Sequence, residues 1–299
     1  MKRMKNIFAI VFYVALAFGL MCSCRKVDSP VPTTLSDSLD PDSLPCGRGY
    51  ILTQPGTPLP GVFTVADPDG VPGSGDEKRV QFSHGNLASL AETEQWGIFA
   101  NQYDCLETPW YSGVHTLVSL YEPGDLSTRG PYGDGAQTSF SFDVFDFGQI
   151  AFPGSGWRML SAQEWSYLFG MVFQGFYEID ESNPRRNLYR VGVEVMGRNC
   201  VVLYPDNYQG TKEETFNTEQ DYIDATNAGI VFLPLAGMCA HSSPIEGFGV
   251  QGFYWSNTPN GWDYMYRILI DESDFIDLSP VKIRRYFSVR LVKDYIPAN

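Results

Sequence analysis

The chain has 299 residues, with 21 Lys and Arg against 35 Asp and Glu, which gives a formal net charge of -14 and a pI near 4.6. This acidity argues against nucleic acid as a partner, because phosphate binding depends on clustered Lys and Arg. The 20 Phe, 17 Tyr and 6 Trp can fill a large core, and 29 Gly, 20 Pro and only 19% charged residues favour a β-rich extracytoplasmic domain with many turns.

The first 23 residues predict an export signal. Three basic residues among the first five precede an apolar run at positions 7–21. A membrane-spanning helix needs roughly 20 apolar residues, whereas the apolar part of a signal peptide needs only about 7–15. Ser23-Cys24 follows the run and resembles a bacterial lipobox, in which the cysteine is acylated and becomes the new first residue. We therefore expect lipid attachment at Cys24 and a location in the cell envelope, at the outer membrane, with an ordinary secretory peptide as the alternative.

The next segment predicts a spacer between the lipid and a folded domain. Residues 24–49 are rich in Ser, Asp and Pro and hold few large apolar side chains. Such a segment cannot bury enough surface to fold, so we expect a flexible stalk there. The globular domain is expected at 50–297, and whether it faces the periplasm or the outside is left open.

Four cysteines remain in the expected mature chain beyond Cys24. They are Cys46, Cys105, Cys200 and Cys239. Four cysteines allow three pairings, so structural disulfides and buried free thiols both stay open. No Cys-x-x-Cys pair occurs, which argues against a structural zinc site or a thioredoxin-like motif.

The predicted elements follow in chain order. Strands are expected at 62–65 and 79–83, joined by a Pro-, Asp- and Gly-rich loop at 66–78. Ser161 and Glu164 have capping-box spacing and predict a helix whose buried face carries Trp165, Leu168, Phe169 and Val172. A second helix is expected to begin at Thr218 and to end before Gly229. Further strands are expected at 200–204, 230–233, 252–256, 264–270 and 285–292. This order favours an α+β fold with a twisted, mostly antiparallel sheet and two flanking helices.

Six segments in order carry a family resemblance. They are residues 80–87, 96–104, 156–165, 228–237, 252–256 and 287–292. Together they resemble the major paralogous domain lipoproteins of Bacteroidetes, which are similar to formylglycine-generating enzyme and share a C-type-lectin-like fold. The resemblance implies one such domain with long loops on one side. The sequence departs from the family pattern at Asp146-Phe147-Gly148 and in the acidic stretch at 271–277.

The resemblance also defines which chemistry to look for. The enzyme of this superfamily binds copper through two cysteines late in the chain, but here none follows Cys239. The calcium-binding motifs of lectins are also missing; the acidic stretch at 271–277 is either a calcium loop or, more plainly, a solvated hairpin tip. We therefore expect no catalytic residue, no cofactor and no metal ligand.

Other polar residues are expected to be structural or, for the three histidines, structural or surface residues, not catalysts. His84, His115 and His241 are far apart in the sequence, and no hydrolase or phosphate-binding motif includes them. Glu164 is expected to cap a helix, and Arg290, inside a strand pattern, is expected to form a structural ion pair. Trp165 and Trp255 are expected in the core.

Three aromatic residues are the candidate binding site. Trp262 follows the turn signal Asn260-Gly261, and Tyr264 and Tyr266 follow it closely. The sequence thus predicts a lipid-anchored, non-enzymatic envelope protein that binds a glycan or a protein. A divergent oxidoreductase related to formylglycine-generating enzyme and a structural subunit of a surface appendage are the alternatives.

Overall fold

The computed structural model describes thirteen stretches of the chain. These are residues 44–46, 50–70, 74–90, 95–105, 110–111, 114–115, 118–119, 146–173, 178–213, 215–240, 244–261, 264–283 and 285–297. The chain divides into two units, Met1–Ser38 and Leu39–Asn299, and all described residues belong to the second. The predicted signal peptide and Cys24 lie outside the described residues. No helix among the described residues has the length and apolarity needed to cross a bilayer.

The largest sheet has nine strands, and all its pairings are antiparallel. Its main path runs β1 (Leu44–Cys46), β2 (Tyr50–Thr53), β5 (Gln95–Phe99), β4 (Lys78–Leu90), β19 (Arg290–Asp294) and β9 (Arg158–Met159). β3 (Phe63–Ala66), β6 (Trp110–Tyr111) and β7 (Val114–His115) lie off this path. β1 falls within the predicted stalk, so the sheet begins before residue 50.

Three smaller sheets complete the strand content. One has the order β12 (Thr215–Phe216), β10 (Tyr189–Val195), β11 (Arg198–Leu203) and β13 (Val231–Pro234), with only the β10–β12 pair parallel. The others are β14 (Cys239–Ala240), β18 (Arg285–Phe287) and β8 (Val118–Ser119), and β15 (Gln251–Pro259), β16 (Tyr264–Asp271) and β17 (Ile276–Lys282). Mostly antiparallel sheets with few helices make this a sheet-rich α+β fold, as predicted.

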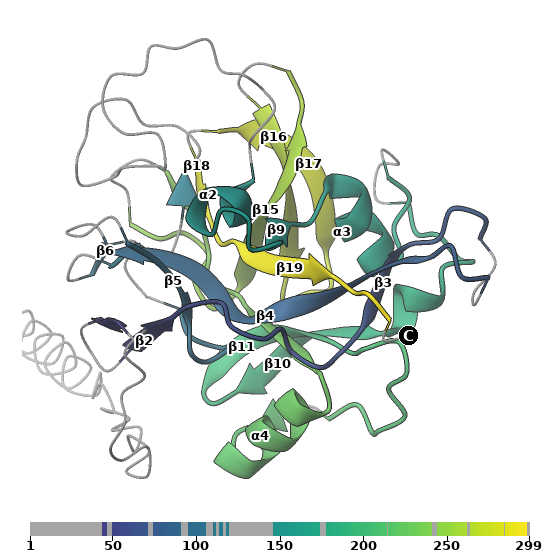
Figure 1. Cartoon of the computed structure of the whole chain (residues 1–299), viewed down its shortest axis with the longest axis horizontal. Helices are drawn as coiled ribbons and strands as arrows, with labels where there is room; N and C mark the ends of the chain where they lie inside the picture. Colours follow the sequence, from purple (N-terminus) through teal and green to yellow (C-terminus); the bar gives the residue numbers. More distant parts are fainter. Residues whose placement is uncertain are drawn as a thin grey trace, which may run out of the picture. The chain divides into compact units, whose positions relative to one another are not determined.

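The helices are short and begin at defined caps. They are α2 (Phe147–Ala151), α3 (Ala162–Leu168), α4 (Glu219–Asn227) and the 3-10 helix η1 (Pro184–Asn187). At α3 the Ser161 hydroxyl accepts from Glu164 N, and the Glu164 carboxylate accepts from Ser161 N, which confirms the predicted capping box. Figure 1 shows α3 between β3 and the β15–β17 sheet, and α4 beside the four-stranded sheet.

Two expectations for these elements need correction. α3 ends at Leu168, before Gly170 turns the backbone with a φ of 65°, so Val172 lies beyond the helix and is 37% exposed. The strand expected at 285–292 is split into β18 and β19. Between them Ser288 bonds to the β15 backbone, and Val289 O accepts from Leu87 N, so this segment bridges sheets instead of continuing one.

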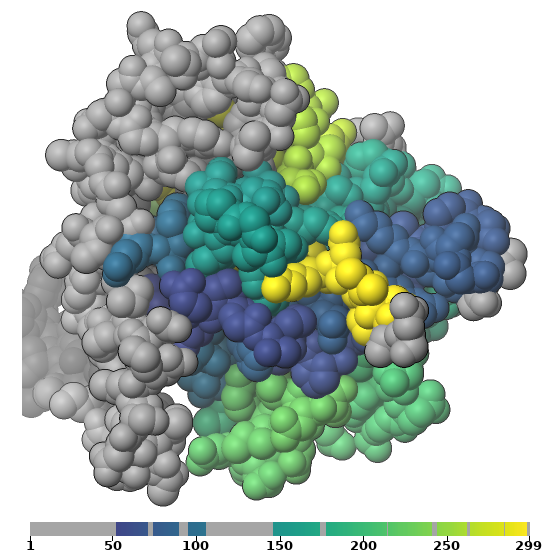
Figure 2. Space-filling model, viewed as in Figure 1, coloured from purple at the N-terminus to yellow at the C-terminus, as the bar shows by residue number. Residues whose placement is uncertain are grey.

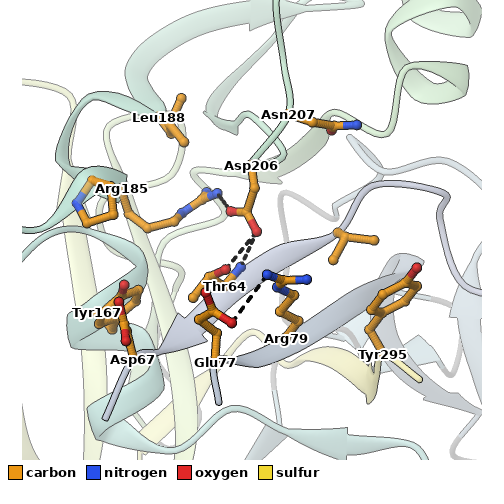
Figure 3. A pocket seen from close by; sticks show the side chains of 12 residues that line it. Thr64, Asp67, Glu77, Arg79, Tyr167, Arg185, Leu188, Asp206, Asn207 and Tyr295 are labelled. Atoms are coloured by element: carbon orange, nitrogen blue, oxygen red, sulfur yellow. Dashed lines mark hydrogen bonds and ion pairs between the residues drawn. The ribbon is translucent and has the colours of Figure 1, made fainter. Parts of the chain in front are cut away.

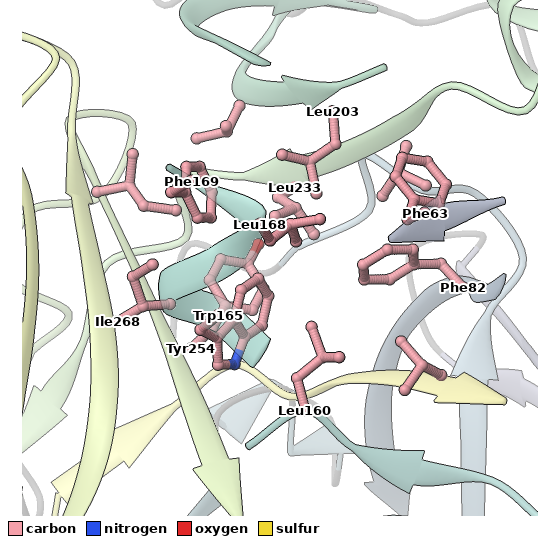
Figure 4. Close-up of a cluster of buried hydrophobic side chains, with 14 of the residues drawn as sticks. Phe63, Phe82, Leu160, Trp165, Leu168, Phe169, Leu203, Leu233, Tyr254 and Ile268 are labelled. Atoms are coloured by element: carbon pink, nitrogen blue, oxygen red, sulfur yellow. The ribbon is translucent and has the colours of Figure 1, made fainter. Parts of the chain in front are cut away.

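The main core lies where α3 meets the sheets (Figure 4). Trp165 is fully buried and packs against Phe169 and Tyr254, and its indole N–H donates to the carbonyl of Trp255. Trp255 is 1% exposed and belongs to a second apolar cluster with Phe287. Both tryptophans are therefore in the core, as predicted.

Two glycines allow a close backbone contact beside this core. Gly229 ends α4 with a φ of 80°, as predicted for a C-terminal glycine. A Cβ atom on Gly61 would lie 2.1 Å from Gly229 O. Only glycine at both positions allows the two backbones to approach this closely.

None of the cysteines whose side chains are described forms a disulfide. Cys105, Cys200 and Cys239 are all buried, so for these three the structure has buried thiols and not the disulfides that the sequence left open. Burial raises the pKa of Cys200, and the neighbouring Cys105 adds to this effect. The side chain of Cys46 lies outside the described residues.

Arg290 forms a buried polar network that corrects another expectation. Its side chain is 1% exposed and donates to Asn86 Oδ1 at 2.9 Å, and to the backbone carbonyls of Ser83 at 3.1 Å, Gln102 at 3.1 Å and Phe232 at 2.6 Å. Within the described residues no carboxylate pairs with it. The predicted ion pair is wrong there because peptide carbonyls and one amide take the place of an acid. Burial lowers the pKa of Arg290 to about 10.

Asp104 lies in the same loop as Gln102 and makes stability depend on pH. Burial raises its pKa to about 6, although Asn101 donates to it through the backbone N–H and the side-chain amide. Because an unfolded Asp titrates near pH 4, the folded state binds the proton more tightly between these values. The free energy of unfolding should therefore fall by about 2–3 kcal/mol as the pH rises from roughly 4 to 7.

Asp104→Asn should remove that contribution, because the asparagine oxygen can still accept from Asn101 but does not ionise. The measurement is urea unfolding across this pH range. Asp224→Asn, on the exposed face of α4, is the matched control and should keep the wild-type slope. An unchanged slope in Asp104→Asn would contradict the assignment.

Candidate functional site

One pocket of about 480 Å³ gathers charged and aromatic side chains (Figure 3). Its walls come from β3, the start of β4, the end of α3, η1, the segment after β11 and the segment after β19. Five charged residues and two tyrosines line it: Asp67, Glu77, Arg79, Arg185, Asp206, Tyr167 and Tyr295. In Figure 2 the yellow C-terminal segment lies on the surface beside the blue start of β4, and Tyr295 N donates to Arg79 O.

Asp206 joins two walls of the pocket. Its Oδ2 atom accepts from both the backbone N–H and the hydroxyl of Thr64, each at 2.8 Å. Its backbone N–H donates to Val62 O at 3.0 Å. The segment after β11 is therefore fastened along β3, although the two lie 142 positions apart.

Arg185 is the most buried charge in the pocket. Its side chain is 1% exposed, and its guanidinium donates to Asp206 Oδ1 at 2.5 Å and to Tyr204 O at 2.9 Å. The same group lies 5.2 Å from the ring centre of Phe63. Burial lowers the pKa of Arg185, and the Asp206 carboxylate opposes that shift.

A second ion pair lies at the start of β4. Arg79 and Glu77 are joined at 3.3 Å, with the Glu77 side chain only 4% exposed. The Gly75 backbone N–H also donates to the Glu77 carboxylate. The two arginines of the pocket are thus each matched by one acid.

Three aspartates gather at the loop beside the pocket. Carboxylate oxygens of Asp67, Asp69 and Asp76 lie within 4.8 Å of one another, and among the described residues this is the only such acidic group. Partial desolvation, a hydrogen bond with Asp69 and repulsion from its acidic neighbours raise the pKa of Asp67. Burial, together with the charges of Asp67 and Asp206, raises the pKa of Tyr167 to about 12.

Unpaired polar atoms are concentrated in this pocket. Six buried side-chain nitrogen or oxygen atoms of the described residues have no hydrogen-bond partner, and three of them belong to residues that line the pocket: Asp67 Oδ1, Arg79 Nε and Arg185 Nε. A buried polar atom without a partner costs about 1–3 kcal/mol, so native proteins have few of them. Three of the residues that line this one cavity therefore carry a polar atom without a partner, one acceptor and two donors.

The aromatic residues singled out in the sequence do not line this pocket. Tyr264 and Tyr266 lie on β16, where Tyr264 is 39% exposed and Tyr266 packs against Phe173 with ring centres 5.6 Å apart. Trp262 lies outside the described residues. Their binding role stays a prediction.

Among the other polar residues singled out in the sequence, the structure describes the side-chain surroundings of Glu164 and His84. Glu164 caps α3, and although burial alone would raise its pKa, ion pairs with Arg158 and Lys78 lower it. His84 lies on β4, where desolvation and the charge of Arg290 lower its pKa. His115 lies on β7, and His241 is outside the described residues.

The acidic stretch at 271–277 forms the tip of the β16–β17 hairpin. Asp271 accepts from Ser273 and Gln251, and Asp277 pairs with Arg267 at 2.7 Å. These carboxylates are bonded separately and do not converge on one point. The hairpin-tip interpretation therefore fits the described residues better than a calcium loop.

The pocket was missed because its residues follow no local spacing. The loop at 66–78 was expected, but its acids were not connected with Arg185 or Asp206, more than a hundred positions away. No family model, curated protein or solved structure matches this chain. What the pocket does is therefore inferred from its own geometry.

Asp206→Ala should destabilise the fold by about 2–3 kcal/mol, because it leaves the Arg185 charge buried without an acidic partner. This is less than the ~3–5 kcal/mol typical of fully buried pairs, since the Asp206 side chain is 30% exposed. Urea unfolding measures the effect. The exposed Glu213→Ala in the neighbouring loop is the control, and equal stability of the two variants would contradict the structural role of this pair.

Proposed function

We propose that this protein is a non-enzymatic binding module of the cell envelope and that the pocket takes a glycan. The observation that carries the proposal is the set of open donors and acceptors on Asp67, Arg79 and Arg185 in a cavity of about 480 Å³. Sugar hydroxyls donate and accept at once, so they suit a wall that offers both. The volume falls in the range of about 300–1,000 Å³ usual for small-molecule sites.

Two of the three pocket acids, Asp206 and Glu77, are engaged in a way that supports binding over catalysis. Both Asp206 oxygens are engaged, Oδ1 by Arg185 and Oδ2 by Thr64, and Glu77 accepts from Gly75 and Arg79. A general base needs a free lone pair aimed at the proton that it removes. The three described thiols are buried, which also disfavours the alternative of an oxidoreductase related to formylglycine-generating enzyme.

The finer fold assignment belongs to the same proposal. Antiparallel sheets with α3 and α4 beside them agree with a C-type-lectin-like domain of the lipoprotein family that the sequence resembles. A lipid on Cys24 would hold this domain at the outer membrane. The anchor is supported by the sequence of residues 1–24.

A protein partner at β16 is the second candidate function. Tyr264 is 39% exposed, and the exposed Val172 lies next to Phe173, which packs on Tyr266. Partly exposed aromatic rings are frequent anchors of protein interfaces. Mutations in the pocket and at β16 can test the two candidate surfaces independently.

The glycan proposal is tested with an array of neutral, amino and acidic oligosaccharides. Tyr295→Ala removes a ring that lines the pocket but leaves its backbone bond to Arg79, so binding should weaken about tenfold. The matched control Tyr264→Ala removes a ring on β16 and should bind as the wild type does. Weaker binding by Tyr264→Ala and unchanged binding by Tyr295→Ala would place the glycan site at β16. A wild-type protein that binds no glycan would overturn the proposal.

The anchor is tested by labelling cells with radioactive palmitate. The wild-type protein should carry the label and sediment with membranes, because several acyl chains together hold a protein durably on a bilayer. Cys24→Ser should carry none. Label that persists in Cys24→Ser would contradict acylation at this residue.

A further inference from the structure

The charges on the pocket walls cancel in pairs except at one end. Arg185 is matched by Asp206, and Arg79 is matched by Glu77. Asp67 has no cationic partner among the described residues, and its close neighbours Asp69 and Asp76 are also acidic. The pocket therefore has an excess of negative charge at the Asp67 end, which disfavours an anionic ligand there.

The unpaired hydrogen-bonding atoms also differ between Asp67 and the two arginines. At the acidic end the unpaired atom is an acceptor, Asp67 Oδ1. The other two unpaired atoms are donors. One is Arg79 Nε on β4, which pairs with β3 just before Asp67, and the other is Arg185 Nε on η1, in a side chain that is 1% exposed. Figure 3 shows Asp67 beside Tyr167, while Arg185 extends along the wall toward Asp206. A complementary ligand presents a donor, preferably a cation, to Asp67 and acceptors to the arginines.

We propose that the pocket binds an amino sugar, with its free ammonium group at Asp67 and its hydroxyl oxygens toward Arg79 and Arg185. This inference rests on the proposed glycan function and specifies the ligand class. An ammonium group supplies the cation that Asp67 lacks, and it relieves the repulsion among the three aspartates. Neutral hydroxyls suffice at Arg79 and Arg185, because each arginine already has a carboxylate partner.

The probes are three monosaccharides that differ at one position: glucosamine, N-acetylglucosamine and glucose, each with its β-1,4-linked tetrasaccharide. They present an ammonium, an acetamide or a hydroxyl group there. Calorimetry should show the amino forms binding about tenfold or more tightly than the other two, because a hydrogen bond between charged groups exceeds a neutral one by about that factor. Added salt should weaken the amino forms most, since the three aspartates are partly exposed.

Asp67→Asn should abolish this preference and leave the neutral sugars unaffected. The control Asp274→Asn removes an acidic side chain at the β16–β17 hairpin, where the φ of 64° suits asparagine, and should keep the preference. Asp76→Asn, in an exposed position, should reduce the preference by a smaller factor. This second variant tests the charge effect even if Asp67→Asn disturbs the loop.

The outcomes separate the two proposals. Equal binding of all three sugars, unchanged in Asp67→Asn, would overturn the amino-sugar inference and leave the glycan function standing. Sugar binding that requires added calcium and is lost with EDTA would also overturn it, because a metal ion would then be the cation at Asp67. Binding of none of the monosaccharides or tetrasaccharides would count against both proposals.

Discussion

The buried guanidinium of Arg290 is the interaction on which the arrangement of the sheets depends. It joins the last strand to β4 through Ser83 and Asn86, to the loop at 100–105 through Gln102, and to β13 through Phe232. Removing a cation from water is costly, and four hydrogen bonds offset that cost here without a neutralising acid from the part of the chain that the structure describes. Because these acceptors are 58 to 207 positions from Arg290, the network forms only when the whole domain is folded.

The position of the pocket follows from the same constraint. One wall belongs to β3 and β4 of the nine-stranded sheet, and another to the segment after β11 of the four-stranded sheet. Arg290 and the core around α3 hold the two sheets together, and Asp206 fastens their edges through Thr64. In a rigid frame of this kind, polar atoms that would otherwise pair with one another stay available to a ligand.

The elements that were predictable from the sequence rest on local chemistry. Ser161 and Glu164 are three positions apart, and α4 follows Thr218 and ends before Gly229, so short-range spacing is enough to place both helices. The network of Arg290 and the pocket around Arg185 arise from contacts over long sequence separations, which no spacing reveals. Tyr264 and Tyr266, chosen from a turn signal, lie on a strand outside the pocket, and their binding role stays a prediction.

The contact between Gly61 and Gly229 gives a way to recognise true relatives of this protein. Gly61 directly precedes Val62, whose carbonyl accepts from Asp206 N, so a methyl group at either glycine would force apart backbone next to the pocket wall. The two positions are distant in the chain but sterically inseparable, and a sequence that keeps both can retain the spacing of the cavity. Inheritance of this glycine pair is thus a better marker of a shared pocket than overall similarity among sheet-rich domains.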